Sequence, residues 1–299
     1  MSLSTPVIRY HGGKFRLADW VIRHFPPHHF YVEPFGGAAS VLLCKERSHG
    51  EVYNDLDGDI VNLFRVLQDP ASRQALTERL VLTPYARDEY RLAWEDTSDL
   101  IERARRTIIR AQMGFGASGA TKGSTGFRIN CQRAYSTAQQ VWSRYPDSLA
   151  AIGQRFAGVL IENRPAIEVM QQHDHPQTLH YVDPPYLHGT RALRNGTDIR
   201  SSRTMSGNSH RYYRHEMTDA DHEQLLLALR RLGGMVVLSG YPSDLYRDTL
   251  DDWFLTTTTA RISAGRGTGL RTECLWLNPQ ALEHSRQLRL FHFKEVFNG

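Results

Sequence analysis

Hydrophobic and polar positions follow two different patterns along this chain. Towards both ends, short apolar runs stand between glycine, proline and polar residues, which is typical of strands buried in a parallel sheet. These runs lie at residues 30–33, 51–53, 158–161, 179–182, 235–239, 254–258 and 273–277. Between them, residues 59–157 show helical spacing without a convincing strand, and this stretch is too long for a simple crossover. The pattern predicts an α/β fold with a helical insertion.

Helices are predicted in the connections between these strands. Apolar residues at helical spacing indicate helices at residues 17–22, 38–45, 166–171, 219–229 and 243–250. Thr218 and Asp221 have the spacing of a capping box at the start of one of them. We expect the last two strands to pair antiparallel and to close the sheet.

The stretch Asp183-Pro184-Pro185-Tyr186 directly follows the predicted strand 179–182. Two prolines in succession remove two backbone donors and force a turn there, at the sheet edge where α/β proteins bind ligands. Asp183 and the Pro184 carbonyl are suited to accept the two hydrogens of a nucleobase amino group. Tyr186 is suited to stack on an extruded base. An ordinary Pro-Pro turn explains these four residues alone equally well.

A second motif surrounds the first predicted strand. The strand 30–33 leads into Pro34-Phe35-Gly36-Gly37, whose glycines would let a nucleoside-bearing cofactor approach the backbone. Asp55 stands twenty positions after Phe35, where an acid on the second strand meets ribose hydroxyls. The turn is not the phosphate-binding G-x-G-x-x-G, which argues against a nicotinamide dinucleotide. The alternative is an ordinary βαβ unit with a surface aspartate.

A third motif, Tyr10-His11-Gly12-Gly13-Lys14, precedes the first predicted helix. Such a turn can present backbone donors and an ammonium to a ligand carboxylate. Taken by itself, a plain turn is the simpler interpretation.

Basic side chains concentrate in two segments. Residues 101–160 hold nine Lys and Arg against two acidic residues, and residues 186–215 hold six Arg against one Asp. Because the whole chain has a net charge of +4, the remainder is acidic. This distribution indicates a nucleic-acid surface, with a solvated charged surface as the alternative. The residues expected to contact DNA are Arg105, Arg110, Lys122, Arg128, Arg191 and Arg203.

The composition narrows the other possibilities. At 299 residues and 40% hydrophobic content, the chain suits a large domain or a domain with an insertion. No window resembles a membrane span, and residues 1–14 lack the apolar core of a signal peptide. Cys44, Cys131 and Cys274 lie far apart, and the histidines form no convincing ligand set. We expect a cytoplasmic protein without a metal.

The three motifs and Asn54-Asp55 occur in an order that resembles the DNA adenine methyltransferase family, in the arrangement where the cofactor motif precedes the catalytic one. The residues that carry the resemblance are Tyr10–Lys14, Glu33–Gly37, Asn54-Asp55 and Asp183–Tyr186. Their order is far more specific than any one motif. The resemblance covers most of the chain outside about residues 58–157.

This resemblance implies an S-adenosylmethionine-dependent enzyme with a Rossmann-like seven-stranded methyltransferase sheet and an inserted helical target-recognition domain. The catalytic domain would comprise residues 1–57 and 158–299, and the insertion residues 58–157. Asp183, Pro184, Pro185 and Tyr186 would hold a flipped adenine. The cofactor would contact Tyr10, Lys14, Phe35, Gly36, Gly37, Asp55 and Asp183. The expected partner is double-stranded DNA, bound by a monomer of bacterial or phage origin.

Parts of the chain depart from the family pattern. The glycine-rich stretch 114–126 is either a flexible linker or, as we expect, a DNA-contacting loop or hairpin that reads the sequence around the target. It lacks the Asn- and Pro-containing pattern of members that recognise GATC, so we expect another site. The Arg-rich residues 187–215 are a second candidate, as a lid. Pro165 replaces an acid that commonly contacts the cofactor adenine, so that contact is lost or comes from a neighbour such as Asn163.

We therefore expect methyl transfer from S-adenosylmethionine to the exocyclic amino group of adenine in DNA, in restriction–modification or in bacterial or phage epigenetic marking. The amino group of cytosine presents similar geometry, and the resemblance rather than the physics favours adenine. A catalytically silent nucleic-acid-binding module of the same fold is the alternative from another class, and the intact Asp183–Tyr186 set argues against it. Charge alone does not separate DNA from RNA.

Overall fold

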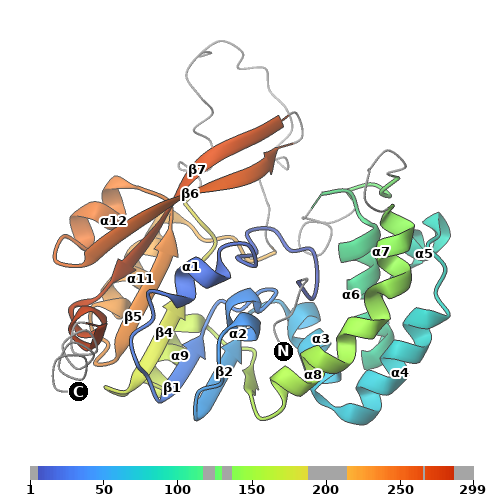
Figure 1. The fold of residues 1–299 in the computed structure, drawn as a ribbon, viewed down its shortest axis with the longest axis horizontal. Helices are drawn as coiled ribbons and strands as arrows, with labels where there is room; N and C mark the ends of the chain where they lie inside the picture. Colours follow the sequence, from blue (N-terminus) through green and yellow to red (C-terminus); the bar gives the residue numbers. More distant parts are fainter. Residues whose placement is uncertain (1–5, 117–124, 130–136, 188–213, 265–266, 286–299) are drawn as a thin grey trace, which may run out of the picture.

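The computed structural model describes residues 6–116, 125–129, 137–187, 214–264 and 267–285. Its strands are β1 (Phe30–Glu33), β2 (Gly50–Asn54), β3 (Leu160–Glu162), β4 (Thr178–Val182), β5 (Met235–Gly240), β6 (Phe254–Ala264) and β7 (Gly267–Leu277). They form a seven-stranded sheet in the order β3-β2-β1-β4-β5-β7-β6 (Figure 1). Strands β1 to β5 run parallel, whereas β7 is antiparallel to β5 and β6 to β7. The expected α/β class, the seven-stranded sheet and the antiparallel closing pair are confirmed.

Helices occupy the connections between the strands, as predicted. Those of the sheet region are α1 (Ala18–Ile22), α2 (Ser40–Cys44), α9 (Ala166–Gln172), α11 (Asp219–Leu229) and α12 (Asp244–Thr249). The segment between β2 and β3 contains α3 (Gly58–Gln68), α4 (Pro70–Val81), α5 (Arg87–Leu92), α6 (Leu100–Met113), α7 (Ala138–Arg144), the 3₁₀ helix η2 (Tyr145–Ser148) and α8 (Leu149–Phe156). Helix α11 begins with the predicted capping box of Thr218 and Asp221.

Both faces of the sheet are buried, because helices pack on each side. Tyr31 and Tyr181 belong to the hydrophobic cluster that includes residues of α1 and α2. The next residue of each strand belongs elsewhere: Val32 packs with α9, and Val182 with α11 and α12. The pleat of a strand produces this alternation. Burial on both faces explains why the strands are recognisable as continuous apolar runs.

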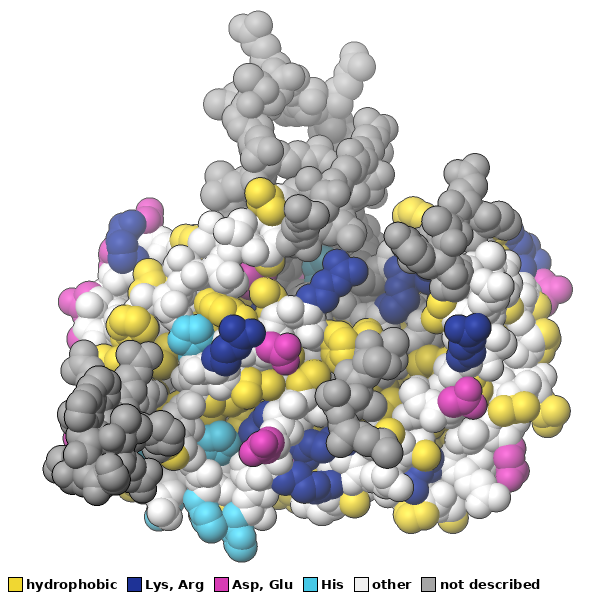
Figure 2. All heavy atoms as spheres, in the orientation of Figure 1, with side chains coloured by type: hydrophobic (Ala, Val, Ile, Leu, Met, Phe, Trp, Pro, Cys, Tyr) yellow, Lys and Arg dark blue, Asp and Glu magenta, His cyan; other side chains and the backbone are white. Residues whose placement is uncertain are grey.

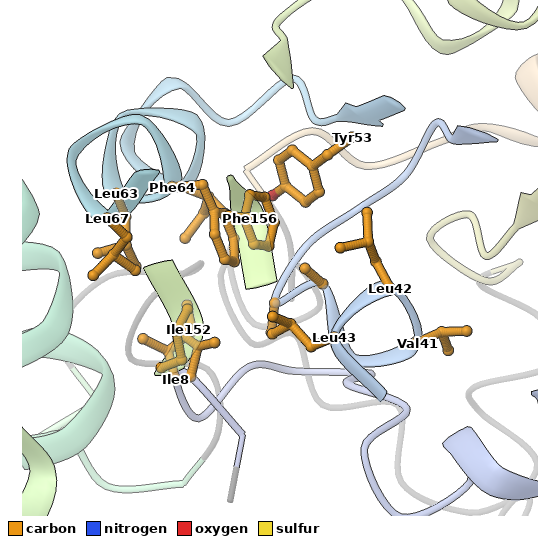
Figure 3. Packing of buried hydrophobic residues seen from close by; sticks show 14 of the residues in the cluster. Ile8, Val41, Leu42, Leu43, Tyr53, Leu63, Phe64, Leu67, Ile152 and Phe156 are labelled. Atoms are coloured by element: carbon orange, nitrogen blue, oxygen red, sulfur yellow. The ribbon is translucent and has the colours of Figure 1, made fainter. Parts of the chain in front are cut away.

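The helical segment α3 to α8 shares a hydrophobic core with the sheet. The rings of Phe64 in α3 and Phe156 in α8 stack at 4.4 Å, and Tyr53 of β2 lies 4.8 Å from Phe64 and 5.5 Å from Phe156 (Figure 3). Ile8 and Ile152 belong to the same cluster. Because this core is continuous, the division into a catalytic domain and an inserted domain at residues 58 and 157 remains a prediction.

Strands β6 and β7 form a hairpin that extends beyond β5. Their pairing runs from Phe254↔Leu277 to Ala264↔Gly267, whereas β5 pairs with β7 only over Cys274–Leu277. In Figure 1 the hairpin rises above the sheet. The sequence predicted both strands but not their projecting parts, since strands that pair only with each other show no apolar run.

We predict that Phe156→Ala destabilises the whole protein, because the ring packs against both the sheet and α3. The expected loss is about 3–5 kcal/mol of unfolding free energy, measured by urea denaturation followed by circular dichroism. Leu82→Ala is the control, since Leu82 is 82% exposed and its loss should leave the midpoint unchanged. A loss for Phe156→Ala below about 1 kcal/mol would show that the two regions do not share a core.

Candidate active site

The candidate site lies where the chain changes its direction of travel across the sheet. From β1 the chain proceeds outward through β2 to β3, and from β4 it proceeds the other way to β5. Strands β1 and β4 are neighbours, so the loops after them diverge and leave a crevice at their carboxyl ends, the usual ligand position in such sheets. Three stretches singled out in the sequence lie at the carboxyl ends of parallel strands and therefore meet at this edge. They are Pro34–Gly37 after β1, Asn54-Asp55 at the end of β2 and Asp183–Tyr186 after β4.

A cavity of about 560 Å³ opens there. Its walls include all residues of the sequence motifs for which we expected a catalytic or cofactor role. These residues are Tyr10, Lys14, Phe35, Gly36, Gly37, Asp55, Asp183, Pro184, Pro185 and Tyr186. Arg214–Met217 and the start of α9, residues 165–167, complete the walls. The structure thus brings these motifs together, while the role of each residue stays a prediction.

The glycine turn after β1 is held against β2. Gly37 has a φ of +46°, in the region that favours glycine, and its N–H donates to the Asp55 carboxylate at 2.8 Å. The Tyr53 hydroxyl donates to the Gly37 carbonyl at 2.7 Å. Gly36 lies so close to Tyr53 that an added Cβ would stand 2.1 Å from the ring. The turn therefore requires glycine at both positions.

Two carboxyl groups near this turn, the buried Glu33 and the half-buried Asp55, have raised pKa values. Burial raises the pKa of Asp55 to about 6, although the backbone N–H groups of Asp57 and Gly37 stabilise its ionised form. Burial raises the pKa of Glu33 to about 8, although the Tyr31 hydroxyl donates to it at 2.7 Å. At neutral pH, Asp55 is therefore mostly ionised and Glu33 mostly protonated.

Lys14 links the N-terminal turn to the turn Asp183–Tyr186. Its Nζ lies 3.2 Å from Asp183 Oδ1 and 3.7 Å from Glu273 Oε2, and 4.5 Å from the centre of the Tyr186 ring. The side chains of Lys14 and Glu273 are each 6% exposed, whereas that of Asp183 is 17% exposed and lines the cavity. The ammonium therefore pairs with two carboxylates of the protein, and its expected contact with a ligand carboxylate stays a prediction.

The charges of this cluster reinforce one another. Burial lowers the pKa of Lys14, but the Asp183 and Glu273 carboxylates outweigh this effect, and the net pKa is raised. Burial raises the pKa of Glu273, and Lys14 opposes that rise. Burial also holds the pKa of Tyr186 well above its ordinary value. The acid that faces the cavity thus has a permanent cation and a protonated phenol beside it.

Sequence reasoning missed three residues around Tyr186. Its hydroxyl donates to Glu273 Oε2 at 3.0 Å and lies 3.1 Å from Ser239 Oγ, and its ring meets the ring of Tyr241 edge to face at 4.4 Å. Glu273 and Ser239 belong to the apolar runs that predicted β7 and β5. The available signal was the charge itself, because a carboxylate within a buried strand requires partners.

The neighbour expected to replace an acid at position 165 has another role. The side-chain amide of Asn163 donates to the backbone carbonyl of Asp55 at 2.7 Å. The cavity wall at this point is formed instead by Pro165, Ala166 and Ile167. This part of the wall offers apolar side chains and the backbone at the start of α9.

The described arginines among the expected DNA contacts are engaged within the protein. Arg105 donates to both carboxylate oxygens of Glu102 at 2.7 and 2.8 Å, and to Glu89 at 2.8 Å. Arg110 donates to Asp59 at 2.7 Å and lies over the ring of Trp94. Both arginines are less than a tenth exposed. This arrangement favours a structural role for both over phosphate contact.

The glycine-rich stretch 114–126 begins and ends as a hairpin. Gly114 and Phe127 form an antiparallel bridge, and the Arg128 N–H donates to the Met113 carbonyl at 2.7 Å. The side chain of Arg128 is buried like those of the other described arginines of the set. Residues 117–124, and with them Lys122, lie outside the described residues, as do Arg191 and Arg203. Their DNA contacts therefore stay predictions.

Two findings concern membranes and metals. None of the helices in the described ranges is long and apolar enough to cross a bilayer. Within the same ranges, His, Cys, Asp and Glu side chains form no group of three or more that would hold a metal ion. Cys44 and Cys274 are free thiols, and Cys131 lies outside the described residues.

The sheet order, the glycine turn and the acidic strand ends define a Rossmann-like methyltransferase. The model of the D12 class N6 adenine-specific DNA methyltransferases matches residues 10–233, and the chain belongs to this family. A methyltransferase requires a methyl donor. The match ends before β5, so that the β6–β7 hairpin and Glu273 lie beyond it.

Curated relatives match shorter parts of the chain. A DNA adenine methylase of Serratia marcescens is 28% identical over 113 residues, which are 36% of this chain and 41% of the relative. The protein of the same name from Escherichia coli K12 is 29% identical over 84 residues, 28% of this chain and 30% of the relative. That of Haemophilus influenzae is 38% identical over 66 residues, 21% and 22% of the two chains. The chain thus matches less than half the length of these relatives.

We predict that Asp59→Asn destabilises the junction between the site and the helical segment. Asp59 lies 2.6 Å from Arg103 and 2.7 Å from both Arg110 and Arg214, and its own side chain is 10% exposed. Removing its charge leaves these arginines without their shared partner, which should cost about 3 kcal/mol of unfolding free energy. Urea denaturation at pH 7 measures the loss.

The same pairing fixes the sign of a pH effect. Burial tends to raise the pKa of Asp59, but Arg103, Arg110 and Arg214 lower it from 3.8 to about 2. Its stabilisation is therefore complete above pH of about 4 and is lost as the pH falls through about 2. The variant should lack this part of the acid transition. Asp88→Asn, which breaks an exposed pair with Arg91, is the control. It should change neither the unfolding free energy at pH 7 nor the acid transition. Equal behaviour of the two variants would contradict the assignment.

Proposed function

We propose that this protein transfers a methyl group from S-adenosylmethionine to the N6 amino group of adenine in DNA. The observation that carries the proposal is the Asp183 carboxylate, which faces the cavity at the end of β4 with the Lys14 ammonium beside it. Membership of an N6 adenine-specific family supports adenine over cytosine. The relatives named DNA adenine methylase support DNA as the substrate. The intact Asp183–Tyr186 set argues against a catalytically silent module.

The cavity walls fit S-adenosylmethionine as the methyl donor. The cavity volume of about 560 Å³ lies within the ordinary range for cofactor sites. Gly36 and Gly37 leave the backbone accessible, and the ionised Asp55 is suited to accept hydrogen bonds from ribose hydroxyls. Phe35 and Ile167 offer apolar surface for a purine ring. When bound, this cofactor supplies a methyl group that its sulfonium makes electrophilic.

The catalytic turn compensates for the weak nucleophilicity of adenine N6, whose lone pair is delocalised into the ring. Asp183 accepts one hydrogen of the amino group and the Pro184 carbonyl accepts the other, which draws the nitrogen towards tetrahedral geometry. Tyr186 offers a stacking face to the extruded base. The carboxylate of Asp183 also stabilises the positive charge that develops on the nitrogen. The protein thus contributes alignment and electrostatics rather than a covalent intermediate.

The segment Arg214–Met217 encloses the site from the helical side. All four of its residues line the cavity. Arg214 anchors it, with Nη1 at 3.1 Å from Asp57 and 2.7 Å from Asp59 at the start of α3. By covering part of the cavity, this segment would limit the access of water, which would strengthen the interaction between Asp183 and the amino group.

The surroundings of the cavity suit double-stranded DNA. Figure 2 shows Lys and Arg side chains on the surface between the β6–β7 hairpin and the helical segment. The catalytic turn meets a single extruded nucleotide, so neighbouring base pairs must be read from a groove by a projecting element. We assign this role to the stretch 114–126, at whose ends Gly114 and Phe127 form an antiparallel bridge. Because it departs from the pattern of GATC-recognising members, the proposed recognition site is a different one.

We predict that Asp183→Ala abolishes methyl transfer and leaves cofactor binding largely intact. The reason is that the carboxylate acts on the amino group, while Asp55 and the glycine turn hold the cofactor. Transfer of tritiated methyl groups to DNA and calorimetry with S-adenosylmethionine measure the two quantities on the same sample. Asp244→Ala, at an exposed position on α12, is the control and should retain both. Near-normal turnover of Asp183→Ala would refute the assignment.

A further inference from the structure

Glu273 on β7 is a buried carboxylate that lies behind the site without lining the cavity. It is 5% exposed, and β5 separates its strand from β4, which carries the catalytic turn. It lies outside the segment that the family model matches. Burial of a carboxylate costs free energy unless partners compensate it. Its partners therefore indicate what it does.

The first partner is the Tyr186 hydroxyl, which lies 3.0 Å from Glu273 Oε2 and 3.1 Å from Ser239 Oγ. A phenol has a single hydrogen to donate. The Tyr186 hydroxyl donates to Glu273, which leaves Ser239 to donate to the phenolic oxygen. This directed chain fixes the far end of the Tyr186 ring, while the edge-to-face contact with Tyr241 fixes its tilt.

The second partner is Lys14, whose Nζ lies 3.7 Å from Glu273 and 3.2 Å from Asp183. If Asp183 were its only partner, the buried ammonium would form a closer ion pair with that carboxylate and would occupy its capacity to accept hydrogen bonds. The second carboxylate holds the ammonium between the two. Asp183 thus keeps acceptor capacity for the hydrogens of the base amino group.

We propose that Glu273 is the positioning residue of this site. It holds the stacking ring of Tyr186, and by sharing the Lys14 ammonium it holds the Asp183 carboxylate. Glu273 thus sets the geometry of Tyr186 and Asp183, the two groups that receive the flipped base. The inference rests on the proposed function, since it assigns Glu273 a part in the same reaction. Glu273 does not line the cavity, so in this proposal it acts only through Tyr186 and Lys14.

The test compares Glu273→Gln with the wild-type protein on a DNA duplex that it methylates. The amide keeps the shape but loses the charge that holds Lys14, and we expect kcat to fall about a hundredfold, as for a displacement of about 1 Å at a reacting group. The KM for S-adenosylmethionine should change less than about threefold, because remote positioning does not alter uniform binding. With 2-aminopurine at the target position, the altered ring position should change the fluorescence of the flipped base.

A pH profile separates positioning from a merely structural role. The groups that face Lys14 are Asp183, Glu273, Tyr186 and Tyr241. Since Glu273 contributes to the raised pKa of Lys14, its neutralisation should move the alkaline limb of kcat/KM to lower pH. Loss of stability alone would lower the whole profile without moving that limb.

Glu51→Gln is the matched control, since Glu51 is equally buried at 5% exposed and pairs with Lys45 at 2.7 Å, away from the cavity. It should lower the melting temperature but keep kcat and the alkaline limb. If Glu273→Gln does not fold, Tyr186→Phe removes the same hydrogen bond from the other end and should change kcat and the 2-aminopurine signal. Wild-type kcat and pH profile in a folded Glu273→Gln, or an unchanged kcat in Tyr186→Phe, would overturn the inference. Absence of transfer by the wild-type protein would instead overturn the proposed function.

Discussion

A buried ammonium shared by two carboxylates joins three parts of the chain that do not pair directly with one another. Lys14 comes from the N-terminal turn, Asp183 from the end of β4 and Glu273 from the antiparallel β7. Each of these charges is costly to bury alone, and each compensates the others. The position of Asp183, and with it the chemistry of the site, depends on this cluster. It also explains why a turn so far from the catalytic motif in the sequence belongs to the same site.

The two basic segments illustrate the difference between charge and accessibility. Arg105 and Arg110 lie in the basic segment with the larger number of Lys and Arg residues, yet they pair with Glu102 and Asp59 inside the protein. These acids stand in the same helix or at the start of α3, so the net charge of a segment hides the pairing. Phosphate contact requires a cation at the surface. The described part of the chain places these two arginines in the framework that supports the helical segment.

Much of the fold and of the site could be predicted from the sequence, for physical reasons. The strands are buried on both faces and therefore appear as apolar runs, and parallel strands bring their carboxyl ends to one edge. Asp55 and Asp183 thus had to meet once both were placed after strands. Glu273 could not be found in this way, because its partners become neighbours only through the antiparallel pairing of β7 with β5. The projecting part of the β6–β7 hairpin was missed because its sequence contains no continuous apolar run.

The chemistry proposed for this site is that the Asp183 carboxylate prepares an adenine amino group for methylation. Its most direct test is mass spectrometry of the nucleosides of unmethylated DNA after incubation with the purified protein and S-adenosylmethionine. We expect N6-methyldeoxyadenosine as the methylated nucleoside, formed by the wild-type protein and absent with Asp183→Ala. Methylation of cytosine instead, or equal amounts of methylated adenine with both proteins, would contradict it.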